Sequence, residues 1–397
     1  MNRFFYFLLL LLVAYGCGKD EPNEINPVDP PVIPVNPVVN PEAVERTVIV
    51  YAVNRSSLSY NFEDDLSEML NAMDSVGTEK YQLLVYKTDS ASKCGLYKAV
   101  SDEYGKCELA LVRSYSRDVT STHPERIREV LEHALDLYPN SAYDLIFWGH
   151  GMSWKPYFSS HEVIDRPMSY GYGGEYNETG NTTMTDWTEI DELAEAVPDH
   201  AFDTVWFDCC YMSGIEVIYE FRDKCDTFVG YPSEVWDEGM AYDVVLPYLL
   251  REKPDVTGAA KAFYNYYDIK RYAATVAVFD MSLMEELAVV AGDIVGSGEI
   301  RPDEKTLLNY SRTRISPFYD FRQFFSQTAL LNGCPDLAAR LESVMDKAVI
   351  YHDASENDFN NRPWNFAVSG ISTHFYKGLD TRDESYYRTL DWYKRVY

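Results

Sequence analysis

The chain has 397 residues, of which 46% are hydrophobic and 15% aromatic, so it holds ample material for a packed core. Its formal net charge of −28 at pH 7 excludes nucleic acid as a natural partner, because phosphate backbones are bound by Lys and Arg. Acidity of this size suits an exported globular protein and would attract cationic partners.

The first residues indicate export. A short positive start, residues 1–3, precedes an apolar run from Phe4 to Ala14 that is too short for a membrane-spanning helix. The run ends just before Cys17, in the layout of a lipoprotein signal peptide. We therefore predict a signal peptide at residues 1–17 and lipid at Cys17, with secretion and nearby cleavage as the alternative. This lipid would be the only membrane anchor, on either face of a bacterial outer membrane.

Residues 18–42 are predicted to be a tether. A Pro-rich stretch favours extended polyproline conformation and cannot bury a core, so it would hold the following body away from a membrane. Its prolines are Pro22, Pro27, Pro30, Pro31, Pro34, Pro37 and Pro41.

Strand and helix patterns alternate in the body that begins at residue 43. This alternation predicts right-handed crossovers and a parallel sheet covered on both faces. Apolar runs predict strands at residues 47–53, 81–86, 143–148, 203–207, 227–230, 274–279 and 368–375, with a hairpin near 94–112. Helical spacing predicts helices near residues 63–75, 124–139, 188–197 and 214–221, and mainly helical stretches at 250–270 and 281–350.

Two consecutive predicted strands end in reactive side chains. The first ends at His150, between two glycines, and the second ends at Cys209 and Cys210. Open parallel sheets place ligands at the carboxyl ends of their strands, so neighbouring strands would bring imidazole and thiol together. A nucleophilic thiol needs a nearby base and a backbone oxyanion donor, and Gly151 allows close approach of its N–H. We also expect the start of the helix after Cys210 to favour thiolate.

Taken singly, both signals have an ordinary structural interpretation. A His-Gly pair after a strand is usually a turn, and a cysteine at a strand end is more often buried filler. Their order on consecutive strands favours a shared site over either interpretation.

The segments around both residues resemble the clostripain family of cysteine peptidases, in the clan of caspases, legumain and gingipains. Residues 144–154, Asp-Leu-Ile-Phe-Trp-Gly-His-Gly-Met-Ser-Trp, resemble that family's strand ending in Trp-x-His-Gly-x-Gly-Trp. Residues 207–212, Phe-Asp-Cys-Cys-Tyr-Met, resemble its Phe-Asp-Ala-Cys-Leu-Met. The resemblance implies a caspase-like α/β/α sandwich with a mostly parallel central sheet over residues 43–285. Residues 286–397 would form a largely helical C-terminal elaboration packed on this core.

The resemblance also implies roles for individual residues. Cys210 becomes the nucleophile, because Cys209 stands where the family usually has alanine. His150 becomes the general acid/base, and the N–H groups of Gly151 and Cys210 become the oxyanion hole. Asp208 occupies the family's acidic position beside the nucleophile and implies an S1 pocket for Arg or Lys, since a buried carboxylate selects a cation.

Further acids and a processing site follow from the same resemblance. Glu234, Asp237 and Glu238 lie in a segment that the family places near the S1 pocket, although surface acids in a charged loop explain them equally well. Self-cleavage is implied in the 152–183 loop, where the basic residues before Cys210 are Lys155 and Arg166.

Two other functions compete with an endopeptidase that cleaves after Arg or Lys. A catalytically silent lipoprotein could bind peptides or glycans through an aromatic loop, and a thiol acyltransferase could use the same cysteine. The loop's aromatics are Tyr157, Phe158, Tyr170, Tyr172 and Tyr176. For the peptidase we expect peptide or protein substrates, a monomer and no required cofactor or metal, and we leave a calcium requirement open.

The remaining cysteines allow disulfides in an oxidising compartment. Cys94 and Cys107 flank the predicted hairpin and are a candidate pair, although sequence cannot establish connectivity. Oxidation of Cys209 and Cys210 to a strained vicinal disulfide would silence the enzyme until it is reduced. No Cys and His spacing indicates a structural zinc site.

Overall fold

The structure is a computed structural model that describes residues 43–90, 93–157, 168–169, 171–176, 184–312, 318–374 and 381–397. The predicted signal peptide, the lipid-acceptor Cys17 and the predicted tether lie outside these residues. None of the helices in the described ranges combines the length and the apolarity that a membrane crossing requires.

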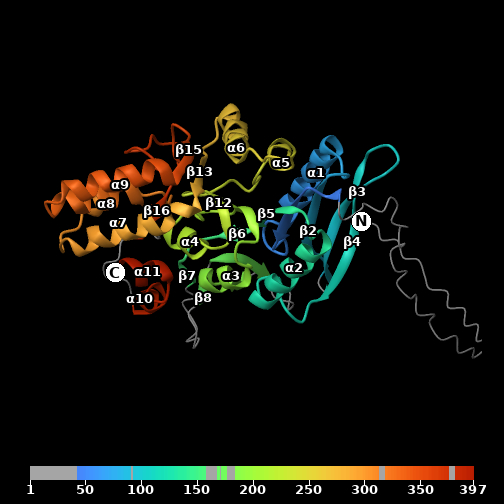
Figure 1. Ribbon diagram of the computed structural model, residues 1–397, viewed down its shortest axis with the longest axis horizontal. Coiled ribbons are helices and arrows are strands. Elements are labelled where there is room, and N and C mark those ends of the chain that lie inside the picture. The colour runs from blue at the N-terminus through green and yellow to red at the C-terminus, as the bar shows by residue number, and fades with distance from the viewer. Residues whose placement is uncertain are drawn as a thin grey trace, which may run out of the picture. The chain divides into compact units, whose positions relative to one another are not determined.

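A nine-stranded sheet forms the centre of the fold, in the order β15-β13-β12-β11-β5-β1-β2-β3-β4 (Figure 1). The strands from β12 to β2 in this order are parallel, and the strands at both edges are antiparallel. This confirms the predicted mostly parallel sheet. Its strands are β1 (Arg46–Ala52), β2 (Tyr81–Ser90), β3 (Lys93–Ser101), β4 (Cys107–Ser116), β5 (Ala142–Trp148), β11 (Phe202–Asp208), β12 (Cys225–Gly230), β13 (Thr275–Asp280) and β15 (Val349–Ala354).

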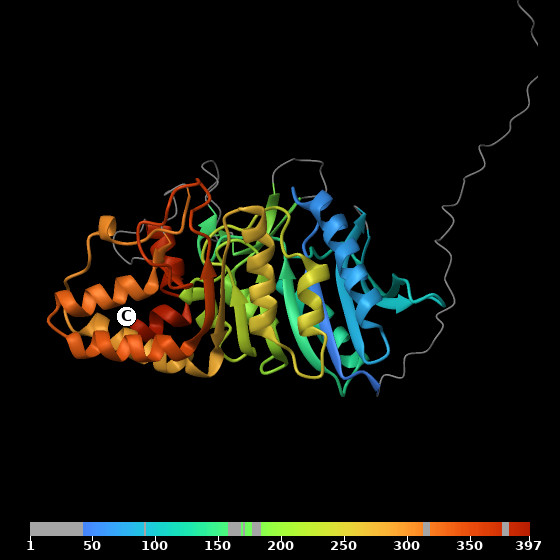
Figure 2. The ribbon, with the colours of Figure 1, turned by 90° about the horizontal axis from the view of Figure 1, so that it is seen from above.

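Helices cover both faces of this sheet, which gives the predicted α/β/α sandwich (Figure 1). One face carries α1 (Ser59–Val76), α5 (Tyr242–Leu249) and α6 (Val256–Lys270), and the other carries α2 (Pro124–Leu137), α3 (Ile190–Ala196) and α4 (Ile215–Glu220). Figure 2 looks onto the face that carries α1, α5 and α6. Successive side chains of a strand point to opposite faces. In β1, Val48 and Val50 pack with Phe62 of α1, whereas Ile49 packs with Ile127 of α2.

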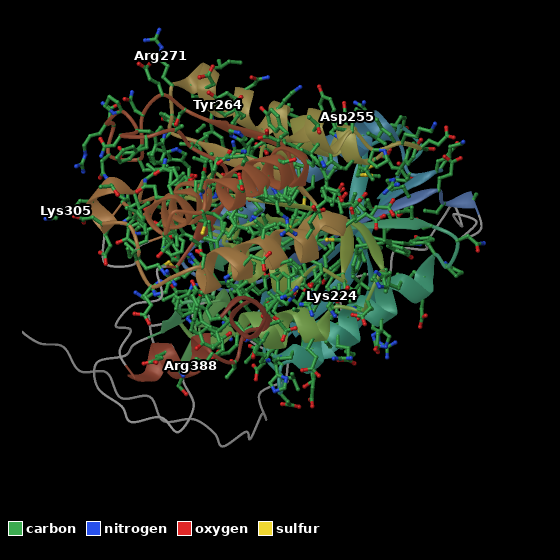
Figure 3. The ribbon with its side chains drawn as sticks, turned by 60° about the vertical axis from the view of Figure 1, so that its left-hand side comes forward. Lys224, Asp255, Tyr264, Arg271, Lys305 and Arg388 are labelled. Carbon is green, nitrogen blue, oxygen red and sulfur yellow. The ribbon has the colours of Figure 1, made fainter. Side chains whose placement is uncertain are left out.

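Asp255 and Arg271, both labelled in Figure 3, are the capping residues at the two ends of helix α6. The Asp255 carboxylate accepts a 2.7 Å hydrogen bond from the Gly258 N–H, the usual way to satisfy a first-turn donor. Arg271 ends the helix in the left-handed conformation, with φ of 59°. Between these ends, the Tyr267 hydroxyl donates to the Gly239 carbonyl at 2.5 Å, so α6 holds the loop before α5.

Residues after 285 continue the same body rather than only adding helices. They supply the sheet's edge strand β15, and Glu216 of α4 accepts hydrogen bonds from Thr373, His374 and Tyr387 at 2.8–3.1 Å. In the described part of the run predicted as a strand at 368–375, residues 368–374, two residues are in strand conformation, Ser372 and Thr373. The elements here are α7 (Met284–Gly296), β14 (Tyr319–Asp320), α8 (Phe321–Leu331), α9 (Pro335–Ala348), β16 (Ser372–Thr373), α10 (Thr381–Tyr387) and α11 (Asp391–Val396).

Small sheets and turns lie outside the central sheet. Strands β6, β9 and β10 form one sheet, β7 pairs with β8, and β14 pairs with β16. Their bounds are β6 (His150–Gly151), β7 (Pro156–Tyr157), β8 (Met168–Ser169), β9 (Tyr172–Tyr176) and β10 (Met184–Thr188), and 3-10 turns cover Met281–Leu283 and Glu304–Thr306.

Candidate active site

The two predicted site strands, β5 and β11, are neighbours in the central sheet. They pair in parallel, with Trp148 opposite Asp208 at their carboxyl ends. His150 and Cys210 each follow two residues after this pair, so both leave the sheet at the same edge. The prediction that these strands are adjacent is therefore confirmed.

Gly151 brings the two chain segments into direct contact. A Cβ on this residue would lie 2.8 Å from the Cβ of Cys209 and 2.8 Å from the carbonyl oxygen of Cys210. Real Cβ atoms are not found so close to a backbone oxygen, so a larger residue would push the segments apart. The absence of a side chain at Gly151 therefore sets the spacing between the His150 turn and the Cys210 turn.

The imidazole of His150 is half-buried at this edge. Its Nε2 lies 2.9 Å from the Ser57 Oγ, and its ring centroid lies 6.1 Å from the Trp187 ring. Burial lowers the pKa of His150 to about 4, because a low-dielectric environment disfavours the charged imidazolium. His150 is therefore neutral at neutral pH.

The thiol of Cys210 is partly exposed and is held by the backbone of Val235. The Val235 N–H donates to the sulfur at 3.4 Å, and the Val235 carbonyl oxygen lies 3.7 Å from it. Burial raises the pKa of the Cys210 thiol to about 12.

The expectation that a helix start favours thiolate at Cys210 is wrong. Helix α4 begins only at Ile215, because Tyr211 adopts a left-handed conformation with φ of 63° and turns the chain first. The helix therefore does not start directly after Cys210, and burial raises the pKa of its thiol rather than lowering it.

Cys209 is completely buried, as expected for a residue at a position where alanine would fit. Its thiol lies 3.4 Å from the Phe147 carbonyl oxygen, and burial raises its pKa well above the ordinary value. Cys209 and Cys210 are both free thiols.

The candidate disulfide between Cys94 and Cys107 is wrong. Both thiols are free, and they lie at opposite ends of the β3–β4 hairpin. Cys94 is opposite Tyr115, whereas Cys107 is opposite Ser101. The antiparallel register separates them by nearly the full length of the strands.

Asp208 lies buried beneath the same edge and faces a second carboxyl group. It accepts hydrogen bonds of 3.0 Å from the Met240 N–H and the Tyr242 hydroxyl, and burial raises its pKa to about 6. Asp65 of α1 accepts a 2.7 Å hydrogen bond from the indole N–H of Trp148, and burial together with Asp208 raises its pKa to about 9. A Cβ on Gly239 would lie 3.0 Å from the Asp208 Oδ2 and 3.4 Å from the Asp65 Oδ2.

The other predicted pocket acids lie in different environments. Glu234 adjoins Val235, its side chain is 13% exposed, and its Oε1 lies 3.5 Å from the Nε of Arg312. Asp237 and Glu238 are exposed, and Glu238 forms a 2.8 Å surface ion pair with Lys270. Of these three acids, Glu234 directly adjoins Val235 and adds to the raised pKa of Cys210.

Part of the predicted loop can be placed. Lys155 follows His150 within the described residues, whereas Arg166, Phe158 and Tyr170 lie outside them. Tyr172 is not accessible for stacking against a glycan, because its side chain is fully buried. Its hydroxyl donates hydrogen bonds to the Tyr51 and Trp148 carbonyls at 2.8 and 3.0 Å.

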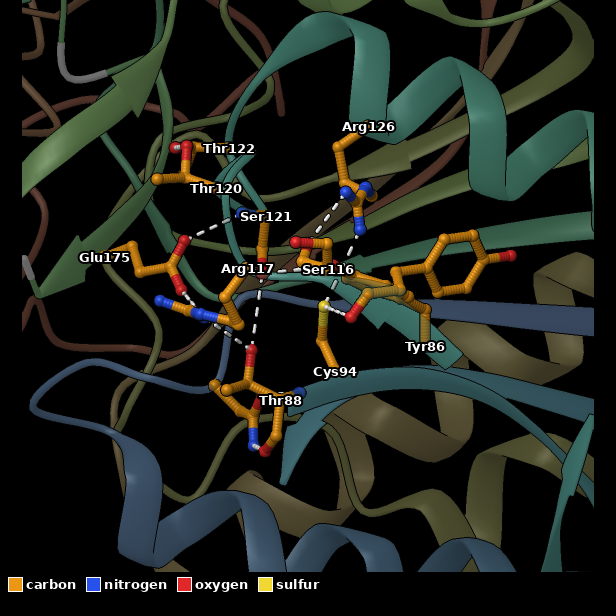
Figure 4. Close-up of polar contacts among 12 residues, drawn as sticks. Tyr86, Thr88, Cys94, Ser116, Arg117, Thr120, Ser121, Thr122, Arg126 and Glu175 are labelled. Carbon is orange, nitrogen blue, oxygen red and sulfur yellow. Dashed lines mark hydrogen bonds and ion pairs between the residues drawn. The ribbon is translucent and has the colours of Figure 1, made fainter. Parts of the chain in front are cut away.

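Strand β9 holds the backbone of His150 and is anchored by a buried ion pair (Figure 4). His150 is opposite Gly173 of β9, and two residues further on the buried Glu175 pairs with Arg117. Glu175 also accepts a 2.8 Å hydrogen bond from the Ser121 N–H. This pair could not be predicted from the sequence, because Arg117 and Glu175 are 58 residues apart.

In the part of the chain that the structure describes, no group of three or more His, Cys, Asp or Glu side chains could hold a metal ion.

Comparisons with known proteins agree with this architecture. The sequence model of the clostripain family, Peptidase_C11, matches residues 50–324. A secreted C11 cysteine protease from Bacteroides thetaiotaomicron, solved with an irreversible peptide inhibitor, is 25% identical, with a TM-score of 0.73. The match covers 89% of this chain and 99% of that chain. An inactive zymogen C11 protease from Parabacteroides distasonis is 24% identical over 91% of this chain and 100% of its own, with a TM-score of 0.73. No curated protein matches the chain.

We expect Glu175→Gln to lower the free energy of unfolding by about 3–5 kcal/mol, because it leaves the Arg117 charge buried without a charged partner. Urea unfolding followed by tryptophan fluorescence measures this loss. The exposed Glu103→Gln serves as the matched control. A loss no larger than that of the control would show that the ion pair does not anchor β9.

We expect iodoacetamide to alkylate Cys210 faster than Cys209 in the folded protein, because of these two residues Cys210 is partly exposed and Cys209 is completely buried. Mass spectrometry of the peptide that contains both residues locates the label. Cys209→Ala should keep the label and Cys210→Ala should lose it. Equal labelling of the two thiols would contradict the burial of Cys209.

Proposed function

Because the chain belongs to the clostripain family of cysteine peptidases, we propose that Cys210 is its nucleophile and His150 its general acid/base. The observation that carries this proposal is the contact of Gly151 with Cys209 and Cys210, which joins the ends of β5 and β11. In this contact an imidazole and a partly exposed thiol share one edge of the sheet, as nucleophilic catalysis requires.

Proton transfer accompanies the attack in the proposed mechanism. Burial keeps the Cys210 thiol protonated and His150 neutral, which supports a resting pair without charges. As the sulfur bonds to the substrate carbonyl carbon, its proton passes to His150, and the N–H groups of Gly151 and Cys210 stabilise the oxyanion. His150 then protonates the leaving amine, and the C–N bond breaks to give a thioester. Water then attacks the thioester and passes one proton to His150, which returns it to the Cys210 sulfur as the C–S bond breaks and the carboxyl product leaves.

Asp208 selects Arg or Lys at P1 in this proposal. Its carboxyl group is buried two residues before the nucleophile, and the neighbouring Asp65, whose pKa is raised to about 9, stays protonated at neutral pH, so Asp208 carries the negative charge. A guanidinium or ammonium group would compensate this charge, whereas a neutral side chain would leave Asp208 without a cationic partner. Glu234 is already engaged with Arg312, and Asp237 and Glu238 are exposed, so we assign these three to the rim.

We further propose that the protein acts outside the cytoplasm, as a monomer without a required cofactor, on peptides or proteins. The similar protease from Bacteroides thetaiotaomicron is described as secreted, which supports export. Lipid at Cys17 would anchor the enzyme to the outer membrane, on its periplasmic or outer face.

We expect the protein to hydrolyse fluorogenic peptides with Arg or Lys at P1, and not those with Ala or Asp. Cys210→Ala should abolish cleavage, and Cys209→Ala should retain it. Asp208→Asn should lower kcat/KM for Arg and Lys substrates by roughly 100-fold, because the cation loses its charged partner. The assay is run under reducing conditions with and without calcium. An unchanged P1 preference in Asp208→Asn would overturn the pocket assignment.

We also expect self-cleavage after Lys155 or Arg166. Incubation of purified protein should give two fragments, and N-terminal sequencing of the second identifies the bond. Replacing both residues with Ala, or Cys210 with Ala, should leave the chain whole. Persistence of the same cut in the Lys155→Ala, Arg166→Ala double variant would refute this processing site.

A further inference from the structure

Three adjacent parallel strands deliver side chains to the candidate site, not two. In the order β11-β5-β1, Ala52 of β1 is opposite Trp148 of β5, which is opposite Asp208 of β11. Beyond these ends the chain reaches Ser57, His150 and Cys210. The Ser57 Oγ lies 2.9 Å from the Nε2 of His150. The turn that follows β1 therefore also contributes a polar contact to the site.

The turn that carries Ser57 is held by other residues. Asn54 accepts a 2.8 Å hydrogen bond from the Thr88 N–H and donates to the Thr88 carbonyl at 3.0 Å. The Ser56 Oγ accepts from the Leu58 N–H at 3.2 Å. Ser57 itself is exposed, so its hydroxyl is not needed to build the turn.

We infer that Ser57 is a positioning residue for His150: its hydroxyl holds the Nε2 side of the ring, so that Nδ1 receives the thiol proton and passes it to the leaving amine. This inference rests on the proposed dyad. It identifies a residue that acts through His150 and does not touch the substrate.

One hydrogen bond suits both working states of the ring. To receive the thiol proton, neutral His150 must have Nδ1 free, so its proton is on Nε2 and the Ser57 Oγ accepts it. After the transfer both nitrogens carry protons, and the Nε2–H still donates to Ser57. The ring therefore keeps one orientation throughout the cycle.

A hydroxyl also fits the charge balance of this site. A carboxylate in the place of Ser57 would stabilise the imidazolium and raise the pKa of His150. Serine orients the ring without adding charge, so the buried ring stays neutral before the attack. Ser57 is thus consistent with the uncharged resting pair.

The test compares Ser57→Ala, Ser57→Thr and Ser59→Ala on a P1 Arg or Lys peptide. Ser57→Ala should lower kcat by roughly 10- to 100-fold with KM within about twofold, because a misdirected base slows proton transfer without weakening binding. Ser57→Thr keeps the hydroxyl and should restore kcat to within about threefold of the parent. Ser59 is also exposed and lies two residues further on, so Ser59→Ala should match the parent.

The outcomes separate this inference from the proposed dyad. If Cys210→Ala is inactive while Ser57→Ala keeps the parent kcat, the dyad stands and the role of Ser57 is refuted. If Ser57→Ala and Ser57→Thr lose the same activity together with thermal stability, the residue is only structural and the inference also fails. If the parent cleaves no peptide, the proposed function fails and this inference fails with it.

Discussion

The in-register parallel pairing of β1, β5 and β11 is the constraint on which the rest of the site depends. Each strand is apolar on both faces, and alternate side chains enter two separate cores. A slip of one residue would exchange these faces, so packing fixes the register at Ala52, Trp148 and Asp208. Because the three strands end level with one another, the turns beyond them meet at one edge. Gly151 then allows the turns of β5 and β11 to touch.

The proposed substrate would supply the positive charge that balances the buried carboxylate of the site. Burial favours a neutral thiol at Cys210 and a neutral imidazole at His150. Asp65 and Asp208 are two buried acids at the same edge, and Asp208 adds to the burial that raises the pKa of Asp65. A cationic P1 side chain would compensate the Asp208 carboxylate, while the scissile carbonyl would accept the negative charge that leaves the thiol. At Cys210 and His150 themselves, charge would therefore appear only as the thiol attacks a bound substrate.

The sequence predicted those features that depend on neighbouring residues or on consecutive strands. His150 and Cys210 could be placed in one site because their predicted strands are consecutive and joined by a single crossover helix. Cys209 could be predicted to be a buried structural residue because it occupies a position where the family usually has alanine. The sequence did not predict the contacts of Ser57, Asp65 and Glu175. These residues are separated from their partners by 93, 83 and 58 residues respectively, and no periodicity connects positions so far apart. The hairpin disulfide failed because the register of β3 and β4 cannot be read from spacing. The thiolate expectation failed because one left-handed residue, Tyr211, delays the start of α4.

The proposed site is tested most directly by a crystal structure of the protein after reaction with a peptidyl electrophile that has arginine at P1. We predict a covalent bond to the sulfur of Cys210 and the guanidinium against Asp208. We also predict that Nδ1 of His150 faces the bonded sulfur while Nε2 remains hydrogen-bonded to Ser57. Attachment to another thiol, or a guanidinium that lies in solvent away from Asp208, would contradict the proposed site.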